Sequence, residues 1–132
     1  MSSILTGITT SGSPHLGNYV GAIRPALEKI KKSKKSFLFL ADYHSVIKQQ
    51  DPLRTHRSSL EIASAWLACG LNPKETCFYR QSKVPQIMEL NWILSNVTSK
   101  GLLNRAHAYK AAQDSNSEKK VKDLDKGITA GL

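Results

Sequence analysis

Strand-length and helix-length segments alternate along this chain, and the alternation limits the folds that it can form. Residues 3–8 and 36–41 have the apolar character of short strands, and a helical pattern interrupted near Pro25 covers residues 17–32 between them. The run SFLFLA at 36–41 is continuously apolar, as expected for a strand covered on both faces. Strands joined through helices form parallel sheets with right-handed crossovers. We therefore expect an α/β fold, the first half of a doubly wound parallel sheet.

The following elements continue this pattern. Asp51 and Pro52 are suited to cap and open a helix that ends at Gly70. Its apolar residues fall on two faces, so burial on more than one side is expected: Leu60, Ala63 and Leu67 on one face, and Ile62, Trp66 and Cys69 on the other. Residues 76–81 form a third predicted strand. Pro85 opens a further helix with apolar residues at helical spacing, namely Ile87, Leu90, Leu94 and Val97.

Composition changes near residue 112. Residues 1–112 are expected to form the half-sheet domain, whereas residues 113–126, QDSNSEKKVKDLDK, are too polar and too weakly periodic for a core element and predict a mobile loop. Residues 127–132 turn apolar again, as at the start of a further element. We therefore expect the chain to be the truncated amino-terminal part of a longer domain.

The overall charge and composition restrict the class of protein. The formal net charge of +9 favours a polyanionic partner. Lysines crowd the end of the first predicted helix, where they complement the helix dipole or contact a ligand: Lys29, Lys31, Lys32, Lys34 and Lys35. Without a membrane-spanning run or a secretory signal, we expect a cytoplasmic protein with no membrane partner. Cys69 and Cys77 lack metal-site spacing, so we expect reduced packing residues and no metal site.

The segment TGITTSGSPHLGNYVGAI, residues 6–23, connects the first predicted strand to the first helix. Its glycines at 7, 12 and 17 and its hydroxyl side chains suit either an ordinary tight connection or a cradle for an anion. Neither GxGxxG nor GxxxxGK[ST] is present, because Ser13 and Pro14 follow Gly12. The position between strand and helix of a parallel sheet favours the anion cradle.

The four residues His15-Leu16-Gly17-Asn18 resemble the HIGH signature of the class I aminoacyl-tRNA synthetases. Together with GITTSG before them and YVGAI after them, they resemble the tryptophanyl-tRNA synthetase family, as do FLFLADYHSVI, QQDP, LACGLNP and LLNRAHAYKAA in the same order. The resemblance implies a Rossmann-like, HUP-type nucleotide-binding fold. One departure is Thr9-Thr10-Ser11, where the family more often has Gln-Pro-Ser, and loss of the proline leaves the loop freer before ATP binds.

The resemblance also implies a reaction, the ATP-dependent activation of tryptophan and its transfer to tRNA(Trp). ATP is then a substrate, Mg²⁺ is expected with it, and His15 and Asn18 are catalytic residues that donate hydrogen bonds toward the phosphates. Gly17 would let the adenine approach the backbone. The residues implied in nucleotide binding are Thr9, Thr10, Ser11, Gly17 and Asn18, and those implied near the tryptophan are Leu5, Gly7, Ala41 and His44.

Simpler roles stay open for several of these residues. Asn18 could cap a helix and Gly17 could close a turn, although the surrounding match favours function. His44 could equally pack or belong to a capped turn. Asp42 could orient His44 or accept from a turn N–H, and the turn is slightly favoured.

The helices carry the remaining candidates. Trp66 and Trp92 are expected to be core or interface anchors. Two roles are open for the group Arg105, His107 and Lys110: contact with tRNA, or a solvated helix face, which is favoured.

The resemblance implies a homodimer that uses the helix after Pro85. Because the family's KMSKS loop is absent from this sequence, we expect the isolated chain to be inactive or nearly so. The alternatives are a tyrosyl-type fragment, disfavoured by Asn18, and a noncatalytic nucleotide- or RNA-binding module.

Overall fold

The computed structural model describes residues 3–129. The chain divides into two compact units, Met1–Val84 and Pro85–Leu132. The boundary expected at residue 112 therefore falls inside the second unit. Among the described residues, no helix combines the length and the apolar character that crossing a membrane requires.

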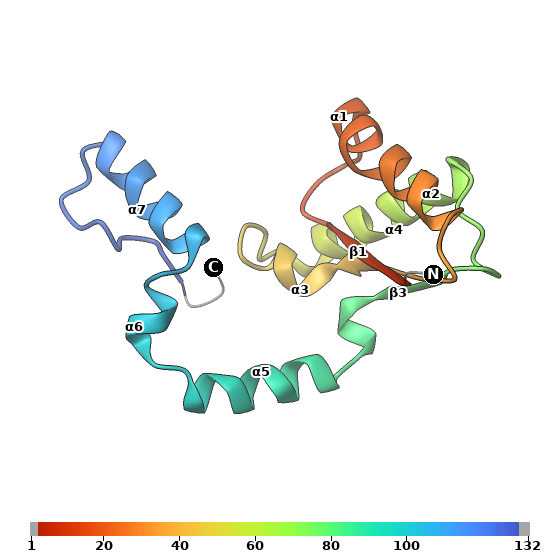
Figure 1. Cartoon of the computed structure of the whole chain (residues 1–132). Helices are drawn as coiled ribbons and strands as arrows, with labels where there is room; N and C mark the ends of the chain where they lie inside the picture. Colours follow the sequence, from red (N-terminus) through yellow and green to blue (C-terminus); the bar gives the residue numbers. More distant parts are fainter. Residues whose placement is uncertain (1–2, 130–132) are drawn as a thin grey trace. The chain divides into compact units, whose positions relative to one another are not determined.

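The first unit is built on a parallel sheet of three strands, β1 (Ser3–Thr9), β2 (Lys35–Ala41) and β3 (Cys77–Arg80), in the order β1-β2-β3 (Figure 1). Thr9 pairs with Ala41, so β1 and β2 end side by side at one edge. The predicted α/β class and parallel half-sheet are confirmed. Within residues 3–129, β1 pairs only with β2 and is an edge strand.

The connection from β1 to β2 is one helical stretch with a widened turn in it. It comprises α1 (Leu16–Asn18), the π-helical η1 (Tyr19–Ile23) and α2 (Arg24–Ile30). The N–H of Arg24 donates to the carbonyl of Tyr19, five residues earlier. Pro25 has no N–H to give to the carbonyl of Gly21, which an α-helix would require, and this explains the predicted interruption near Pro25.

After β2, the chain forms α3 (Asp42–Ser45) and then α4 (Pro52–Ala68), and the short 3-10 helix η2 (Gln81–Lys83) follows β3. Asp51 caps α4 as predicted, because its Oδ1 accepts from the N–H groups of Leu53 at 2.9 Å and Arg54 at 3.3 Å. The helix ends at Ala68, and Gly70 follows its C-cap with a φ of 100°, which suits glycine.

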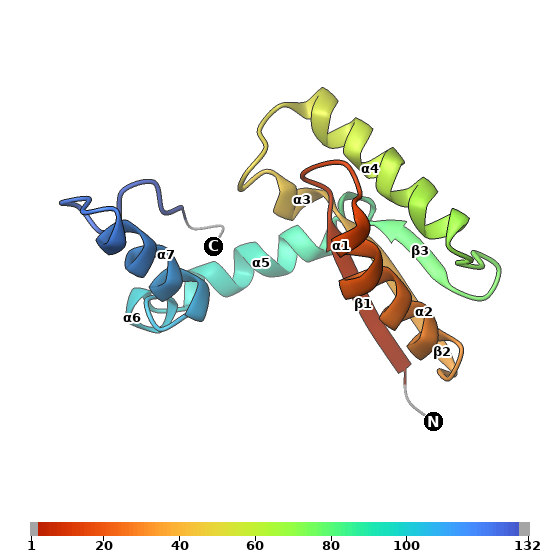
Figure 2. The ribbon, with the colours of Figure 1, turned by 90° about the horizontal axis from the view of Figure 1, so that it is seen from above.

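The core of the first unit lies on one face of its sheet. Figures 1 and 2 show α2 and α4 on the same side, as right-handed crossovers require when successive strands are added in one direction. The core residues are Ile8, Ile23, Ala26, Leu38, Leu40, Ile62, Trp66 and Leu71. Within this unit the opposite face has no helix over it, and Leu5 is 65% exposed there. The expectation that β2 is covered on both faces is therefore wrong for this unit, because side chains on β2 alternate between buried and more exposed positions.

The helix α4 also buries one face rather than two. Ile62 and Trp66 are almost fully buried against the sheet, whereas Leu60 and Leu67 are about half exposed and Cys69 is exposed. Cys69 and Cys77 are both free thiols, as expected, but both are exposed and are not packing residues. The described residues contain no group of three or more His, Cys, Asp or Glu side chains that could hold a metal ion.

The second unit consists of α5 (Gln86–Val97), α6 (Lys100–Leu103) and α7 (His107–Glu118). The loop predicted for 113–126 is wrong over 113–118, which continue α7. Polar side chains stabilise this helix: Tyr109 and Gln113 both donate to Asp125, at 2.7 and 2.9 Å, and Asn116 donates to the carbonyls of Leu124 and Lys126. Residues 127–129 belong to no helix or strand, and the rest of the predicted final element lies outside the described residues.

Candidate functional site

The glycine-rich loop starts where β1 ends, at the carboxyl edge of the sheet. Its first residue, Thr10, is completely buried and is held by Ser45 of α3. The N–H of Thr10 donates to Ser45 Oγ at 3.0 Å, and the two hydroxyl oxygens are 2.8 Å apart. The Thr10 side chain is therefore committed to the protein interior, whereas Thr9 and Ser11 on either side are exposed.

The far side of the loop is joined to α4 by an exposed contact. Ser13 Oγ donates to Glu61 Oε2 at 2.6 Å, and Arg57 Nε donates to Glu61 Oε1 at 3.0 Å. The hydrogen bond from Ser13 and then that from Arg57 lower the pKa of the Glu61 carboxyl below its ordinary value. Ser11 and Gly12 line a groove of ≈ 330 Å³ beside these side chains.

His15 and Asn18 hold each other at the start of the helical stretch. Asn18 Oδ1 accepts from the N–H of His15 at 3.0 Å, and the N–H of Asn18 donates to the carbonyl of His15 at 2.9 Å. The amide oxygen of Asn18 thus caps the start of the helix, the simpler role considered for this residue. Its Nδ2 makes no hydrogen bond within residues 3–129. The exposed His15 ring lies over Gly17, because a Cβ at Gly17 would be 2.9 Å from ring atoms Cε1 and Nδ1.

Leu5 and Gly7, two candidates for the tryptophan site, lie on β1 opposite two phenylalanines of β2. Leu5 pairs with Phe37 and Gly7 with Phe39. A Cβ at Gly7 would be only 2.5–2.7 Å from three carbons of the Phe39 ring, so this ring covers Gly7. Leu5 and Gly7 also line a groove of ≈ 340 Å³ along the open edge of β1, which Ala41 and His44 do not line.

Ala41 and His44, the other two candidates, lie at the carboxyl end of β2. Ala41 is buried, and the exposed His44 is the third residue of α3. His44 Nδ1 is 3.1 Å from Oε1 of Gln81, a buried residue that follows β3. The structure therefore brings Leu5 and Gly7 together on one strand, and places Ala41 and His44 at the adjoining strand end.

Asp42 joins the ends of β2 and β3 rather than orienting His44. Its Oδ1 accepts from the N–H of Ser82 at 2.9 Å, its Oδ2 accepts from the Ser82 hydroxyl, and Arg80 Nε lies 3.4 Å from Oδ2. Asp42 therefore accepts from a backbone N–H, as the slightly favoured role required, but this N–H belongs to Ser82 in η2, 40 residues away, and not to a turn. Sequence reasoning did not identify Ser45, Gln81 or Ser82, because their contacts join residues 35 to 40 positions apart.

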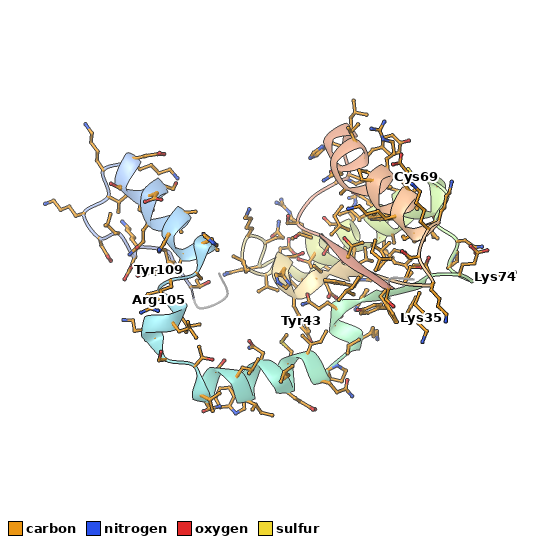
Figure 3. The ribbon with its side chains drawn as sticks, viewed as in Figure 1. Lys35, Tyr43, Cys69, Lys74, Arg105 and Tyr109 are labelled. Atoms are coloured by element: carbon orange, nitrogen blue, oxygen red, sulfur yellow. The ribbon has the colours of Figure 1, made fainter. Side chains whose placement is uncertain are left out.

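The lysine cluster of the first unit lies away from this edge. Lys35 begins β2, and Figure 3 shows Lys35 and Lys74 toward the amino ends of the strands, whereas Tyr43 lies in α3 after the carboxyl end of β2. Lys29 occupies the last turn of α2, which agrees with placement against the helix dipole. In the second unit, Arg105 and Lys110 are exposed and fit a solvated face; Figure 3 shows Arg105 in the turn between α6 and α7.

The sequence profile of one protein family, the class I tRNA synthetases (W and Y), matches residues 1–132, the entire chain. The chain belongs to this family. A tryptophan–tRNA ligase of Neisseria meningitidis is 58% identical over 130 residues, which are 98% of this chain and 39% of that relative. A tryptophan–tRNA ligase of Xanthomonas axonopodis is 63% identical over 130 residues, 98% of this chain and 30% of the relative. The chain thus spans between 30% and 39% of the length of these relatives.

Solved structures of the class I tRNA synthetases share the fold. The tryptophanyl-tRNA synthetase of Campylobacter jejuni complexed with ADP and tryptophan is 37% identical to this chain, with a TM-score of 0.78 over 98% of this chain and 38% of that one. The tryptophanyl-tRNA synthetase of Mycoplasma pneumoniae is 29% identical, with a TM-score of 0.75 over 96% of this chain and 35% of that one. The expected Rossmann-like half-fold of this chain is thereby confirmed.

Proposed function

We propose that the protein carrying this chain activates tryptophan with ATP and transfers it to tRNA(Trp). The observation that supports this most is the glycine-rich loop of a class I synthetase at the carboxyl edge of a parallel sheet, with Ser11, Gly12 and His15 exposed. Doubly wound sheets bind nucleotides at this edge. The relatives named above are tryptophan–tRNA ligases, which favours tryptophan over tyrosine within the family.

In the proposed reaction, a carboxylate oxygen of tryptophan attacks the α-phosphorus of ATP, and the bond to pyrophosphate breaks. A hydroxyl of the terminal tRNA ribose then attacks the activated carbonyl, and AMP leaves. Negative charge develops on phosphoryl oxygens, so donors that are already oriented stabilise the transition state. His15 and the Nδ2 of Asn18 would supply such donors, with Thr9 and Ser11 beside them. Thr10 would contribute by holding the loop in place, because its N–H and its hydroxyl are both bonded to Ser45.

The amino-acid side of the site would use β1 and the adjoining carboxyl end of β2. We assign Leu5, Gly7, Ala41 and His44 to the tryptophan pocket, with Gln81 holding His44. The Campylobacter relative whose fold this chain shares was solved with ADP and tryptophan, which supports a pocket for each. Mg²⁺ would enter with the phosphates of ATP. The protein would work in the cytoplasm, where tRNA is charged.

A homodimer is part of this proposal. On α5, Leu90, Trp92, Ile93 and Val97 are 56% to 77% exposed, and in the described structure no residue of this helix is buried. An apolar helix surface of this extent suits an interface with a second copy. Trp92, which is 71% exposed within this chain, would then be an interface anchor.

The first test of the proposal is Gly17→Val in the full-length protein, measured by calorimetric titration with ATP. A branched side chain here fills the space that the adenine needs and displaces the His15 ring, so we expect the affinity for ATP to fall roughly fivefold to 150-fold, the equivalent of ~1–3 kcal/mol of overpacking. Gly21→Ala is the matched control, because its Cβ would contact nothing within 4 Å. A folded Gly17→Val protein with wild-type ATP affinity would refute the assignment.

The same substitution in a His15→Ala background separates the two effects. Direct exclusion of adenine predicts a further loss of affinity when Gly17→Val is added to His15→Ala. If Gly17→Val adds nothing there, the glycine acts only by making room for the imidazole. Tryptophan-dependent pyrophosphate exchange by the same proteins tests the activation step.

A further inference from the structure

Ser45 holds the first residue of the glycine-rich loop by a set of fully buried hydrogen bonds. Ser45 and Thr10 are both 0% exposed, although they lie 35 residues apart in the chain. Ser45 Oγ receives the Thr10 N–H at 3.0 Å, lies 2.8 Å from Thr10 Oγ1, and donates to the carbonyl of Ala41 at 3.1 Å. One hydroxyl thus ties the loop to the residue at which β2 ends and α3 begins.

Counting protons fixes the direction of these bonds. A serine hydroxyl has one hydrogen and two lone pairs. Because the Ser45 hydrogen goes to Ala41, both lone pairs accept from Thr10, one from its N–H and one from its Oγ1–H. The two hydroxyls and the Thr10 N–H all have hydrogen-bond partners. Removing Ser45 Oγ would leave the Thr10 N–H and the Thr10 hydroxyl buried without an acceptor.

The rest of the loop depends on this contact for its position. β1 ends at Thr9, so Thr10 is the first residue without a partner in the sheet. After it, residues 11–13 are exposed, and the contact from Ser13 to Glu61 is also exposed, where water competes with it. A proline at position 10 would fix φ and would have no N–H to bury. Threonine brings an N–H into the interior here, and Ser45 accepts it.

We propose that Ser45 is a positioning residue that fixes the glycine-rich loop for the nucleotide, replacing the conformational restriction that a proline at position 10 would give. This inference rests on the proposed function for its ATP readout. The loop-fixing role itself concerns the protein without nucleotide and can be measured separately.

The test is Ser45→Ala in the full-length protein. We expect the KM for ATP to rise roughly fivefold, the equivalent of about one hydrogen bond, with kcat changed less than twofold. Without nucleotide, the backbone amides of residues 10–13 should exchange with deuterium faster. The matched control is Ser36→Ala, which removes another buried serine hydroxyl, 3.2 Å from Thr76 Oγ1 at the opposite end of β2. This control should lower stability without changing the KM for ATP or loop exchange.

A rescue variant makes the inference specific. Adding Thr10→Pro to Ser45→Ala removes the buried N–H and hydroxyl of residue 10 and restricts its φ, so the KM for ATP and the loop exchange should return toward wild type. If Ser45→Ala does not fold, Thr10→Val takes its place, because it removes one of the three hydrogen bonds and keeps the N–H bond to Ser45.

Three outcomes would overturn the inference: a folded Ser45→Ala protein with wild-type loop exchange and KM for ATP, an equal effect of Ser36→Ala, or failure of Thr10→Pro to rescue. A wrong proposed function would give a different result: the wild-type protein would not bind ATP. Faster deuterium exchange of the loop amides in Ser45→Ala would still show that Ser45 fixes the loop.

Discussion

Whether alanine at position 7 stabilises or destabilises the protein depends on one contact, that with the Phe39 ring. In Gly7→Ala the new methyl carbon would lie 2.5, 2.6 and 2.7 Å from Cζ, Cε2 and Cε1 of Phe39. Carbon atoms in contact are normally about 3.5–4.0 Å apart, so the ring must move by about 1 Å. Its neighbour on β3 is Tyr79, at a ring-centroid distance of 6.0 Å, and this packing would be disturbed.

Two opposing effects set the magnitude. Forcing an extra methyl against a packed ring costs ~1–3 kcal/mol. Alanine in a strand gains about 0.5–1 kcal/mol over glycine, because glycine loses more backbone freedom on folding. These ranges combine to a net loss between about 0 and 2.5 kcal/mol, so we expect Gly7→Ala to lower the free energy of unfolding within that range.

The assay is urea denaturation followed by far-UV circular dichroism, in wild-type and Phe39→Leu backgrounds. Leucine removes the ring atoms that the methyl would meet, so Gly7→Ala should be neutral or stabilising there, and the two substitutions should be strongly non-additive. Equal stabilisation by Gly7→Ala in both backgrounds would refute the argument that Phe39 excludes a side chain at position 7.

Two further predictions concern other contacts. The Glu61 carboxyl should titrate below its ordinary pKa, because Ser13 and then Arg57 donate hydrogen bonds to it, so its contacts persist at higher pH and are lost as pH falls through the lowered value. By NMR, Ser13→Ala and Arg57→Gln should each raise this pKa, and an unchanged pKa in either variant would contradict the assignment. In the full-length protein, Trp92→Asp should shift sedimentation at micromolar concentration from dimer toward monomer, and a wild-type monomer would exclude the interface on α5.

The elements with strong local signals could be predicted from the sequence. Asp51 and Pro52 start α4, Gly70 follows its end, and the three predicted strands are present, because capping and strand patterns depend on nearby residues. The number of covered sheet faces could not be predicted in the same way. A continuous apolar run such as that of β2 indicates what could be buried, not which elements lie over it.

The contacts that organise the candidate site were not predictable, for a related reason. Ser45 is one hydroxyl among many in the sequence, and only the fold brings it to Thr10. In α7, a polar stretch without apolar periodicity forms a helix because Gln113 and Asn116 bond to residues 124–126, and a window of local composition contains no sign of such pairing.

The two tryptophans of this chain differ in a way that has an optical consequence. Trp66 is 1% exposed and its indole N–H has no acceptor in the described structure, whereas Trp92 is 71% exposed and belongs to the other unit. Indole emission shifts to longer wavelength in water, so each unit of the isolated chain carries its own fluorescent signal. Iodide should quench Trp92 selectively, and the blue component that remains reports the sheet unit alone. Comparing the two signals during denaturation would reveal whether the two units lose their structure together or one after the other.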